Sequence, residues 1–468
     1  MAEPTGRPAG TTGELALLGP DPYVLAPDRV LLPGGFTGRT AVAVGADGTI
    51  ERVGPTDELR ATYRDRRWLE LPGRAVVPGF VDAHHHLTQA FGGPLAFGEP
   101  SEIFKRVWLP LESALTEQEI VASARLAALE SLRGGFTTVA DAGTRSRHDV
   151  GLIAEATTDV GVRCVLPVVC HDAGVDEVQR QAILRRAEAH VARWESTALV
   201  HPSLAIAIPE AATDKTLVEV SRICEESGAV LQTHLNEHLA GVERSLLATG
   251  RRPAEHLHEL GVLGPWLLAA HATMLTAREV RLFAETGAAI SYNPVASAWK
   301  GNAVAPALTL VELGVRVGLG TDATRGDGFR LLDAAETAQR LSTSVGLGDP
   351  DAGRGRLWLD LATRGGAEVT GLARTCGTIE TGRAADLLVV RTDVPELTPS
   401  WDLAWELVRL GNRDLIEAVL VAGRARIVGG APVGWDAAAF LDEARDLAER
   451  AVARAGLRRA RTPGDETA

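Results

Sequence analysis

Histidines and one aspartate stand where apolar runs of the chain end, and together they have the composition of a metal site. The run "PGFVDAHHHLTQAFGG" (residues 78–93) contains three consecutive histidines. Three later runs, "AVLQTHLNE", "WLLAAHATML" and "RVGLGTD", carry a histidine or an aspartate near their ends. Neutral imidazoles with a carboxylate suit Zn²⁺, and Fe²⁺ nearly as well. The residues singled out are His84, His86, His234, His271 and Asp322.

The three consecutive histidines cannot all serve one site. Side chains alternate across a strand, so His84 and His86 share one face, while His85 points to the other face, toward a helix layer. A single histidine at a strand end is more often a hydrogen-bonded core residue than a ligand. Five such residues at the ends of four strands are hard to obtain by chance. His171 and His238 are weaker candidates for a supporting position beside the ligands.

The strands that must position these residues alternate with amphipathic helices. Helical connections imply parallel pairing, and eight strand–helix units predict an α/β fold of the (β/α)8 TIM-barrel type, with its active site at the C-terminal ends of the strands. A doubly wound open sheet is the alternative, but no GxGxxG motif follows the first strand to support it. The eight apolar runs read as strands are "RAVVPGFVDAH", "FTTVADAG", "VRCVLPVVC", "SLAIAIPE", "AVLQTHLNE", "WLLAAHATML", "AAISYNP" and "RVGLGTD".

Two β-rich pieces flank the barrel segment, which spans residues 74–375. Residues 21–73 include "GADGTI", a strong hairpin signal, and residues 376–434 show the same short strands and turns. Because the chain ends of a domain often lie close together, we expect the two pieces to form one composite β-sandwich domain. Residues 435–460 are expected to form an amphipathic C-terminal helix packed on the outside, and residues 1–20 a disordered lead-in.

Composition narrows the partners and the compartment. The formal net charge of -13 argues against a nucleic-acid partner, which needs clustered basic residues. No apolar run approaches the roughly 20 residues of a membrane span, and "MAEPTGRPAGTTG" lacks the apolar region of a secretory signal. The four cysteines show no paired spacing, which indicates buried thiols. We therefore expect a cytoplasmic protein with no membrane partner. A homo-oligomer is an open alternative to a monomer.

The strand-end motifs also carry a resemblance. "PGFVDAHHHL", "LQTHLNE", "LLAAH", "SYNPVASAWKGNAVAP" and "GLGTD" resemble the amidohydrolase superfamily, in particular its cytosine- and guanine-deaminase-like branch, which also holds triazine hydrolases. The resemblance covers residues 23–433 and implies one divalent metal ion, Zn²⁺ first and Fe²⁺ second, held by His84, His86, His234 and Asp322. Binuclear relatives use a carbamylated lysine from strand four. "SLAIAIPE" has no lysine, so the resemblance implies a mononuclear site.

The resemblance also implies catalytic roles. A metal held there would lower the pKa of a bound water toward about 7 and supply hydroxide at neutral pH. We expect Asp322 to accept the proton of that water and His271 to stabilise the developing oxyanion. Glu237 follows His234 by three residues in "HLNE", the HxxE arrangement of the family's deaminases. A carboxylate there can protonate a ring nitrogen and then the leaving amine, as a general acid–base shuttle. An ordinary surface glutamate is the alternative.

Substrate-binding residues are predicted from their positions near these motifs. Gln89 lies in "HHHLTQ", similar to the "HxHLxQ" of enzymes that act on oxo-purines and triazines, where the amide reads the polar edge of the substrate. Trp108 lies in a loop expected to cover the mouth, and Trp299 lies in the loop after strand seven. Each could stack on a flat ring or pack in the interior. The runs "ASAWK" and "ATRGDGFR" depart from the motifs of many relatives, so a different specificity pocket could include Lys300, Arg325 and Asp327.

Three functional hypotheses follow. The leading one is a metal-dependent aminohydrolase that deaminates an amino-substituted N-heterocycle of the oxo-purine, pterin, pyrimidine or triazine type. The alternative among enzymes is a hydrolase that removes chloride, an alkylamine or a formimino nitrogen from a similar C=N carbon. The third is a non-catalytic barrel acting as a binding protein, and the presence of all expected ligands together with Glu237 argues against it.

Overall fold

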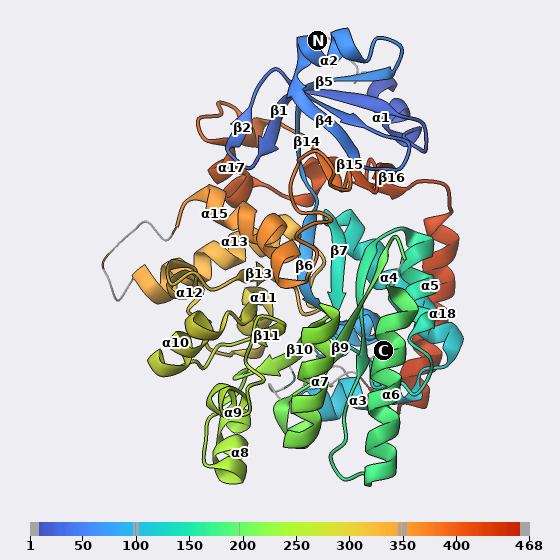
Figure 1. Cartoon of the computed structure of the whole chain (residues 1–468). Helices are drawn as coiled ribbons and strands as arrows, with labels where there is room; N and C mark the ends of the chain where they lie inside the picture. The colour runs from blue at the N-terminus through green and yellow to red at the C-terminus, as the bar shows by residue number, and fades with distance from the viewer. Residues whose placement is uncertain are drawn as a thin grey trace, which may run out of the picture.

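The main body of the protein is a nearly closed barrel of eight parallel strands that are hydrogen-bonded in chain order (Figure 1). The computed structural model describes residues 9–96, 99, 103–195, 197–344, 348 and 353–458. The predicted TIM-type barrel is thus confirmed. Its strands are β6 (Phe80–His85), β7 (Phe136–Asp141), β8 (Arg163–Val169), β9 (Val200–Ala205), β10 (Val230–Leu235), β11 (Leu267–His271), β12 (Ala289–Tyr292) and β13 (Val317–Leu319).

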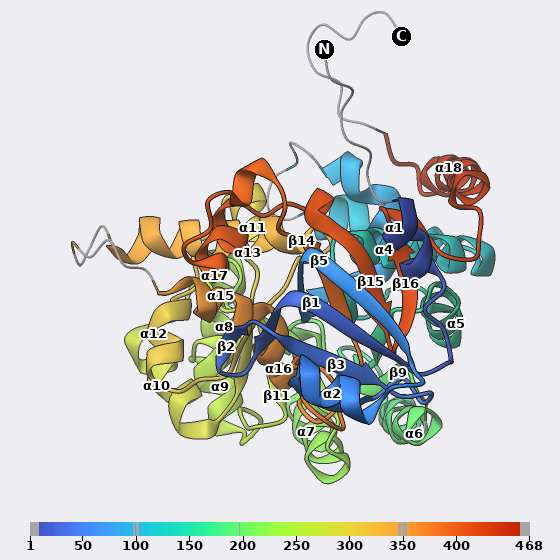
Figure 2. The same cartoon turned by 90° about the horizontal axis from the view of Figure 1, so that it is seen from above.

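Helices surround the barrel (Figure 2). Capping boxes set where several of them begin. Thr116 and Glu119 form such a box before α4, and Thr276 and Glu279 form another before α10, so backbone N–H groups of the first turn are hydrogen-bonded. The helices are α3 (Leu109–Ala114), α4 (Glu117–Arg133), α5 (Gly151–Val160), α6 (Glu177–Trp194), α7 (Asp214–Ser227), α8 (Leu239–Thr249), α9 (Pro253–Glu259), α10 (Ala277–Thr286), α11 (Pro294–Lys300), α12 (Ala307–Glu312), α13 (Gly328–Gln339), α15 (Gly355–Asp360) and α16 (Gly366–Val369).

Both ends of the chain build the second domain, as expected. Its strands form one continuous nine-stranded sheet, and a single apolar cluster takes side chains from both halves. The "GADGTI" hairpin joins β3 and β4, and a Cβ on Gly48 in its turn would lie 2.1 Å from the backbone oxygen of Ala422 in the other half. The elements are β1 (Tyr23–Leu32), β2 (Gly35–Thr37), β3 (Thr40–Val44), β4 (Ile50–Pro55), α2 (Thr56–Thr62), β5 (Arg67–Pro78), β14 (Leu387–Arg391), α17 (Leu403–Leu410), β15 (Ile416–Val421), β16 (Arg424–Val428) and β17 (Ala431–Pro432).

The two ends of the chain differ in how well the sequence predicted them. The disordered lead-in is wrong for residues 9–16, which form helix α1 (Ala9–Ala16), because Leu15 and Leu18 are buried in the apolar cluster of the second domain. Residues 1–8 lie outside the described residues. Helix α18 (Ala437–Arg454) forms where a C-terminal helix was expected. In the described part of the chain, no helix has the length and hydropathy needed to cross a membrane. All four cysteines are free and buried.

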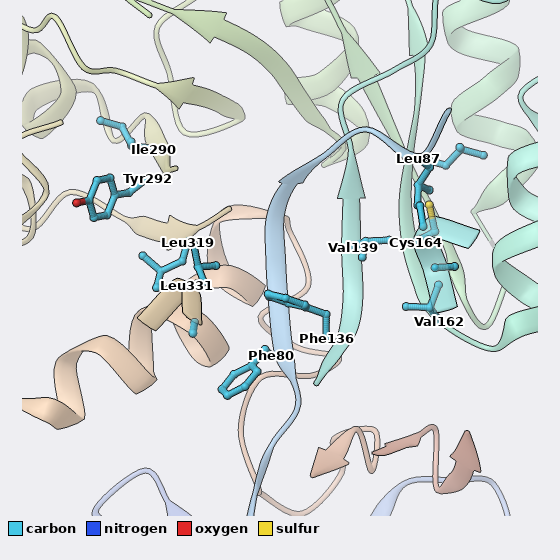
Figure 3. Packing of buried hydrophobic residues seen from close by; sticks show 14 of the residues in the cluster. Phe80, Leu87, Phe136, Val139, Val162, Cys164, Ile290, Tyr292, Leu319 and Leu331 are labelled. Carbon is cyan, nitrogen blue, oxygen red and sulfur yellow. The ribbon is translucent and has the colours of Figure 1, made fainter. Parts of the chain in front are cut away.

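The barrel and the second domain meet at the starts of the barrel strands. Strand β5 extends across residues 73 and 74, the proposed domain boundary, and leads directly into β6. Phe80, the first residue of β6, is fully buried and packs edge-on against Phe136 and Phe329, with ring centroids 6.0 and 5.3 Å away. Figure 3 shows Phe80 and Phe136 at the start of their strands. The opposite ends of the strands therefore point away from the second domain.

We expect Phe80→Ala to lower the free energy of unfolding by about 3–5 kcal/mol, because it removes a buried ring and leaves a cavity. Backbone approaches the ring closely, since a Cβ on Gly328 would lie 2.1 Å from it. The measurement is the urea unfolding midpoint. Leu247→Ala is the control, because that side chain is 89% exposed. Equal midpoints for the two variants would contradict the prediction.

Candidate active site

Four of the predicted residues converge at the C-terminal mouth of the barrel. The Asp322 Oδ1 atom lies 3.3 Å from His84 Nε2 and 3.2 Å from His86 Nε2. His234 Nε2 lies 3.4 Å from His86 Nε2. One ligand atom from each of these four residues lies within 4.8 Å of all the others. The end of β6, the end of β10 and the loop after β13 thus present a compact set of nitrogen and oxygen donors.

The protonation of these donors fits a divalent cation. Nδ1 of His234 donates to the carbonyl oxygen of Ala207 at 2.8 Å, which leaves the Nε2 lone pair facing the group. Burial lowers the pKa of His84 and holds that of His234 well below its usual value, so both rings are neutral. The buried Nε2 atom of His84 has no hydrogen-bond partner among the described residues. Such an orphaned nitrogen is expected where a metal would complete its coordination.

The distances between the candidate ligand atoms also have the size expected for a tetrahedral metal site. Ligand atoms about 2.0–2.1 Å from a tetrahedral zinc ion lie about 3.3–3.4 Å from one another. The three contacts among the four residues span 3.2 to 3.4 Å. These three separations are compatible with one divalent ion held by the four residues.

A second group, on the other side of Asp322, contains the predicted catalytic residues. His271 Nε2 lies 3.7 Å from Glu237 Oε1 and 3.9 Å from Asp322 Oδ2. The Asn293 amide nitrogen donates to His271 Nδ1 at 3.3 Å, and the Asn293 oxygen accepts from Ser291 at 2.8 Å. This pairing places the His271 proton on Nε2. Burial lowers the pKa of His271 to about 3, so the ring is neutral and its N–H points into the site.

Lys300, left without a role by the sequence, joins the two carboxylates. Its Nζ atom donates to Glu237 Oε1 at 2.8 Å and to Asp322 Oδ2 at 2.7 Å. Burial alone would raise the pKa of both carboxyl groups. The Lys300 ammonium is one of the groups that instead hold both pKa values well below their usual range. Both carboxylates are therefore ionised.

The backbone turns sharply where these side chains leave the strands. Seven non-glycine residues of the described chain have positive φ, and five of them follow or end β10, β11 and β13. Left-handed backbone costs an ordinary residue on the order of 1–3 kcal/mol, and such strain gathers at functional sites. The five residues and their φ values are Asn236 (51°), His271 (72°), Ala272 (51°), Asp322 (54°) and Ala323 (54°).

His85 takes no part in the ligand group, as the alternation of side chains predicted. Its Nδ1 atom lies 3.0 Å from Asp82 and 2.9 Å from the Thr321 hydroxyl. The buried Asp82 carboxylate also accepts the backbone N–H of Thr321 at 2.9 Å. The backbone N–H of Asp322 donates to the His84 oxygen at 2.8 Å. These bonds link β6 to the end of β13 where the barrel closes, and they position two of the candidate ligands.

Two weaker candidates lie directly behind the site. His171 Nε2 accepts the backbone N–H of Ala207 at 2.9 Å, and Ala207 supports His234 through its carbonyl oxygen. Burial lowers the pKa of His171 to about 4. His238 Nε2 lies 3.2 Å from Glu237 Oε1. His238 thus contacts a residue of the site directly, whereas His171 is connected to His234 only through Ala207.

The three predicted substrate-binding residues differ in their burial and in the residues they contact. The amide nitrogen of the buried Gln89 donates to Glu112 at 3.4 Å. Trp108 packs over Gly92, where a Cβ would lie 2.7 Å from its ring. Trp299 is 47% exposed beside Lys300. Their contact with substrate remains a prediction.

The two charged residues after β13 are explained without substrate. The Asp327 carboxylate accepts the backbone N–H of Arg330 and so caps α13. Arg325 is half-exposed and lies 3.8 Å from Asp327. Of the three residues left without a role, only Lys300 contacts the candidate catalytic groups.

Comparison with known proteins agrees with this geometry. The sequence model of the amidohydrolase family matches residues 75–426. A 5-methylthioadenosine/S-adenosylhomocysteine deaminase of Syntrophobacter fumaroxidans is 32% identical over 387 residues, covering 82% of this chain and 87% of that protein. A 5'-deoxyadenosine deaminase of Methanopyrus kandleri is 28% identical over 93% of this chain and 99% of its own length.

Solved structures share the fold along nearly the whole chain. An adenosine deaminase of Xanthomonas campestris with bound zinc superposes with a TM-score of 0.84 at 25% identity, covering 92% of this chain and 98% of that one. An atrazine chlorohydrolase of Arthrobacter aurescens, complexed with zinc, has the same fold with a TM-score of 0.78 at 22% identity, over 91% and 100% of the two chains. The expectation of an amidohydrolase related to deaminases is confirmed. The chain belongs to the amidohydrolase family.

Proposed function

We propose that this amidohydrolase is a zinc-dependent aminohydrolase that releases ammonia from an amino-substituted N-heterocycle. The observation that carries the proposal is the pair of adjoining groups at the barrel mouth. His84, His86, His234 and Asp322 could hold one divalent ion, and Glu237, His271 and Asp322 adjoin it. The deaminase relatives act, by name, on adenosine derivatives.

The side chains have complementary tasks in this reaction. A zinc ion bound there would lower the pKa of water to near 7. The ionised Asp322 carboxylate accepts one proton from the attacking water, whose oxygen bonds to the ring carbon. Glu237 takes up the other proton of the water and passes it to the ring nitrogen. The proton held by Asp322 then reaches the amine through Glu237, so the C–N bond breaks and ammonia leaves. The Nε2–H of His271 donates to the oxygen that develops at the ring carbon.

The test is ammonia release from a panel of rings, with metal content measured on the same protein. The panel includes adenosine, 5'-deoxyadenosine, guanine, isocytosine, a pterin and an aminotriazine. We expect about one zinc per chain in the active protein, loss of activity after chelation and recovery on adding zinc. Turnover of halogenated or alkylamino rings without ammonia would favour the other leaving groups. Activity that survives complete metal removal would contradict the proposal.

Other expectations stay predictions. They are a cytoplasmic location, no nucleic-acid or membrane partner, and an oligomeric state that is open between monomer and homo-oligomer. The roles of Gln89, Trp108 and Trp299 in substrate binding are also proposals, which the ring panel can test with single variants.

A further inference from the structure

The Lys300 ammonium has an unused donor inside the candidate active site. Its side chain is 15% exposed, and two of its N–H groups donate to Glu237 and Asp322. An ammonium carries three donors and no acceptor. Nζ makes no third hydrogen bond with any residue that the structure describes. One strong, positively charged donor is therefore left for a ligand.

The two oxygens of Asp322 show on which side of the candidate active site the Lys300 ammonium lies. Oδ1 faces the nitrogens of His84 and His86. Oδ2 accepts from Lys300 and lies 3.9 Å from His271 Nε2. The ammonium therefore lies opposite the metal-type group, between the two residues that must move protons. A ring whose reacting carbon lay between Glu237 and Asp322 would lie beside the ammonium that bridges them.

The residues that follow Lys300 in the chain help to keep its side chain in this position. Helix α11 ends at Lys300, and Gly301 leaves it with φ of 67°, a left-handed turn that favours glycine. The next residue, Asn302, contacts Glu237 Oε1 at 3.5 Å through its nitrogen and His238 Nδ1 at 3.1 Å through its oxygen. One short segment thus supplies both Lys300 and a second polar contact to Glu237.

We propose that Lys300 is a specificity-determining residue that donates a hydrogen bond to an oxo oxygen of the heterocycle. This inference rests on the proposed function and narrows its substrate class to rings in which one ring nitrogen separates a carbonyl carbon from the amine-bearing carbon.

The chemistry of the ring favours oxygen as the acceptor. An aromatic ring nitrogen has one in-plane lone pair, and the nitrogen that Glu237 protonates cannot also accept from Lys300. A carbonyl oxygen has two lone pairs and a larger partial negative charge. A ring with C–H at that place leaves the third N–H of the ammonium without an acceptor, and sites built around a hydrogen bond reject such analogues strongly.

The experiment compares rings that differ only by the oxygen. The pairs are isoguanine and adenine, guanine and 2-aminopurine, and isocytosine and 2-aminopyrimidine. We expect the zinc-loaded protein to prefer the oxo member of the pair it accepts by at least about tenfold in kcat/KM. Lys300→Met should remove most of that preference. Lys215→Met is the matched control, because Lys215 forms an exposed ion pair with Glu177.

A binding measurement separates this inference from the proposed function. Dissociation constants are measured for rings that carry no amine, namely hypoxanthine against purine and 4-pyrimidinone against pyrimidine. We expect tighter binding of the oxo ring, lost in Lys300→Met and in a second variant, Lys300→Gln. Zinc content and circular dichroism verify that the variants fold.

The outcomes have distinct meanings. Binding that depends on Lys300 without any ammonia release would support the inference and refute the deaminase proposal. Ammonia release with an oxo preference that Lys300→Met leaves unchanged would overturn the inference alone. If the wild-type protein showed no preference for the oxo ring in turnover or in binding, the inference would also be overturned.

Discussion

Replacing Glu237 by glutamine is expected to lower kcat about 10²- to 10⁴-fold, the usual contribution of a general acid–base residue, while zinc content stays at the wild-type level. The amide has nearly the same shape but cannot carry the proton between the ring nitrogen and the amine. It can still accept from Lys300 at the oxygen, so the fold around the site should persist. Steady-state kinetics and metal analysis of the same preparation measure the two effects.

Glu243→Gln is the matched control for this variant. Glu243 lies in α8, a few residues along the chain, and its side chain is exposed. It should behave as the wild type. A Glu237→Gln protein with nearly full activity would show that another group moves the proton. A variant that loses zinc would show that Glu237 helps to hold the metal.

Replacing Asp322 by asparagine is expected to lower both zinc affinity and activity, with kcat/KM reduced at least about 10³-fold. Asp322 combines two tasks, since Oδ1 faces His84 and His86 while Oδ2 faces Lys300 and His271. The neutral amide is a poor metal ligand and a poor base, so both tasks fail together. Chelator competition measures the zinc affinity, and kcat/KM is measured at saturating zinc.

Asp327→Asn tests whether the effect is specific. Asp327 lies in the same loop and caps α13, and asparagine is an equally good cap residue. We expect wild-type zinc affinity and activity from this variant. If Asp322→Asn bound zinc as tightly as the wild type, Asp322 would not be a ligand, and the four-residue group would need a different occupant.

The fold could be predicted because its signals are local. The hairpin turn at Gly48 and the capping boxes before α4 and α10 need only neighbouring residues to form. Helix α1 was missed for the opposite reason. Its segment has no capping or charge signal, and Leu15 and Leu18 become buried only because a sheet from distant parts of the chain provides a surface.

The candidate ligands could also be predicted, whereas their partners could not. Strand periodicity separated His84 and His86 from His85, and the resemblance of "HLNE" to the HxxE arrangement of the family's deaminases pointed to Glu237. The sequence did not single out Asn293, Asp82 or Thr321. A polar residue at a strand end carries no local signal that shows which imidazole or backbone group it will contact in the folded protein. The Asn-Pro step after β12 is the one local signal that could have drawn attention to Asn293.

The sequence by itself determined the eight-stranded barrel, the two-ended second domain and the residue types of a metal-dependent hydrolase. These follow from periodicities and spacings of a few residues, which the backbone converts directly into strands, helices and strand ends. Only the tertiary structure decided which oxygen of Asp322 faces the histidines, which nitrogen of His271 carries the proton, and that Lys300 bridges the two carboxylates. Such contacts join residues from different strands, so their geometry arises only when the barrel closes.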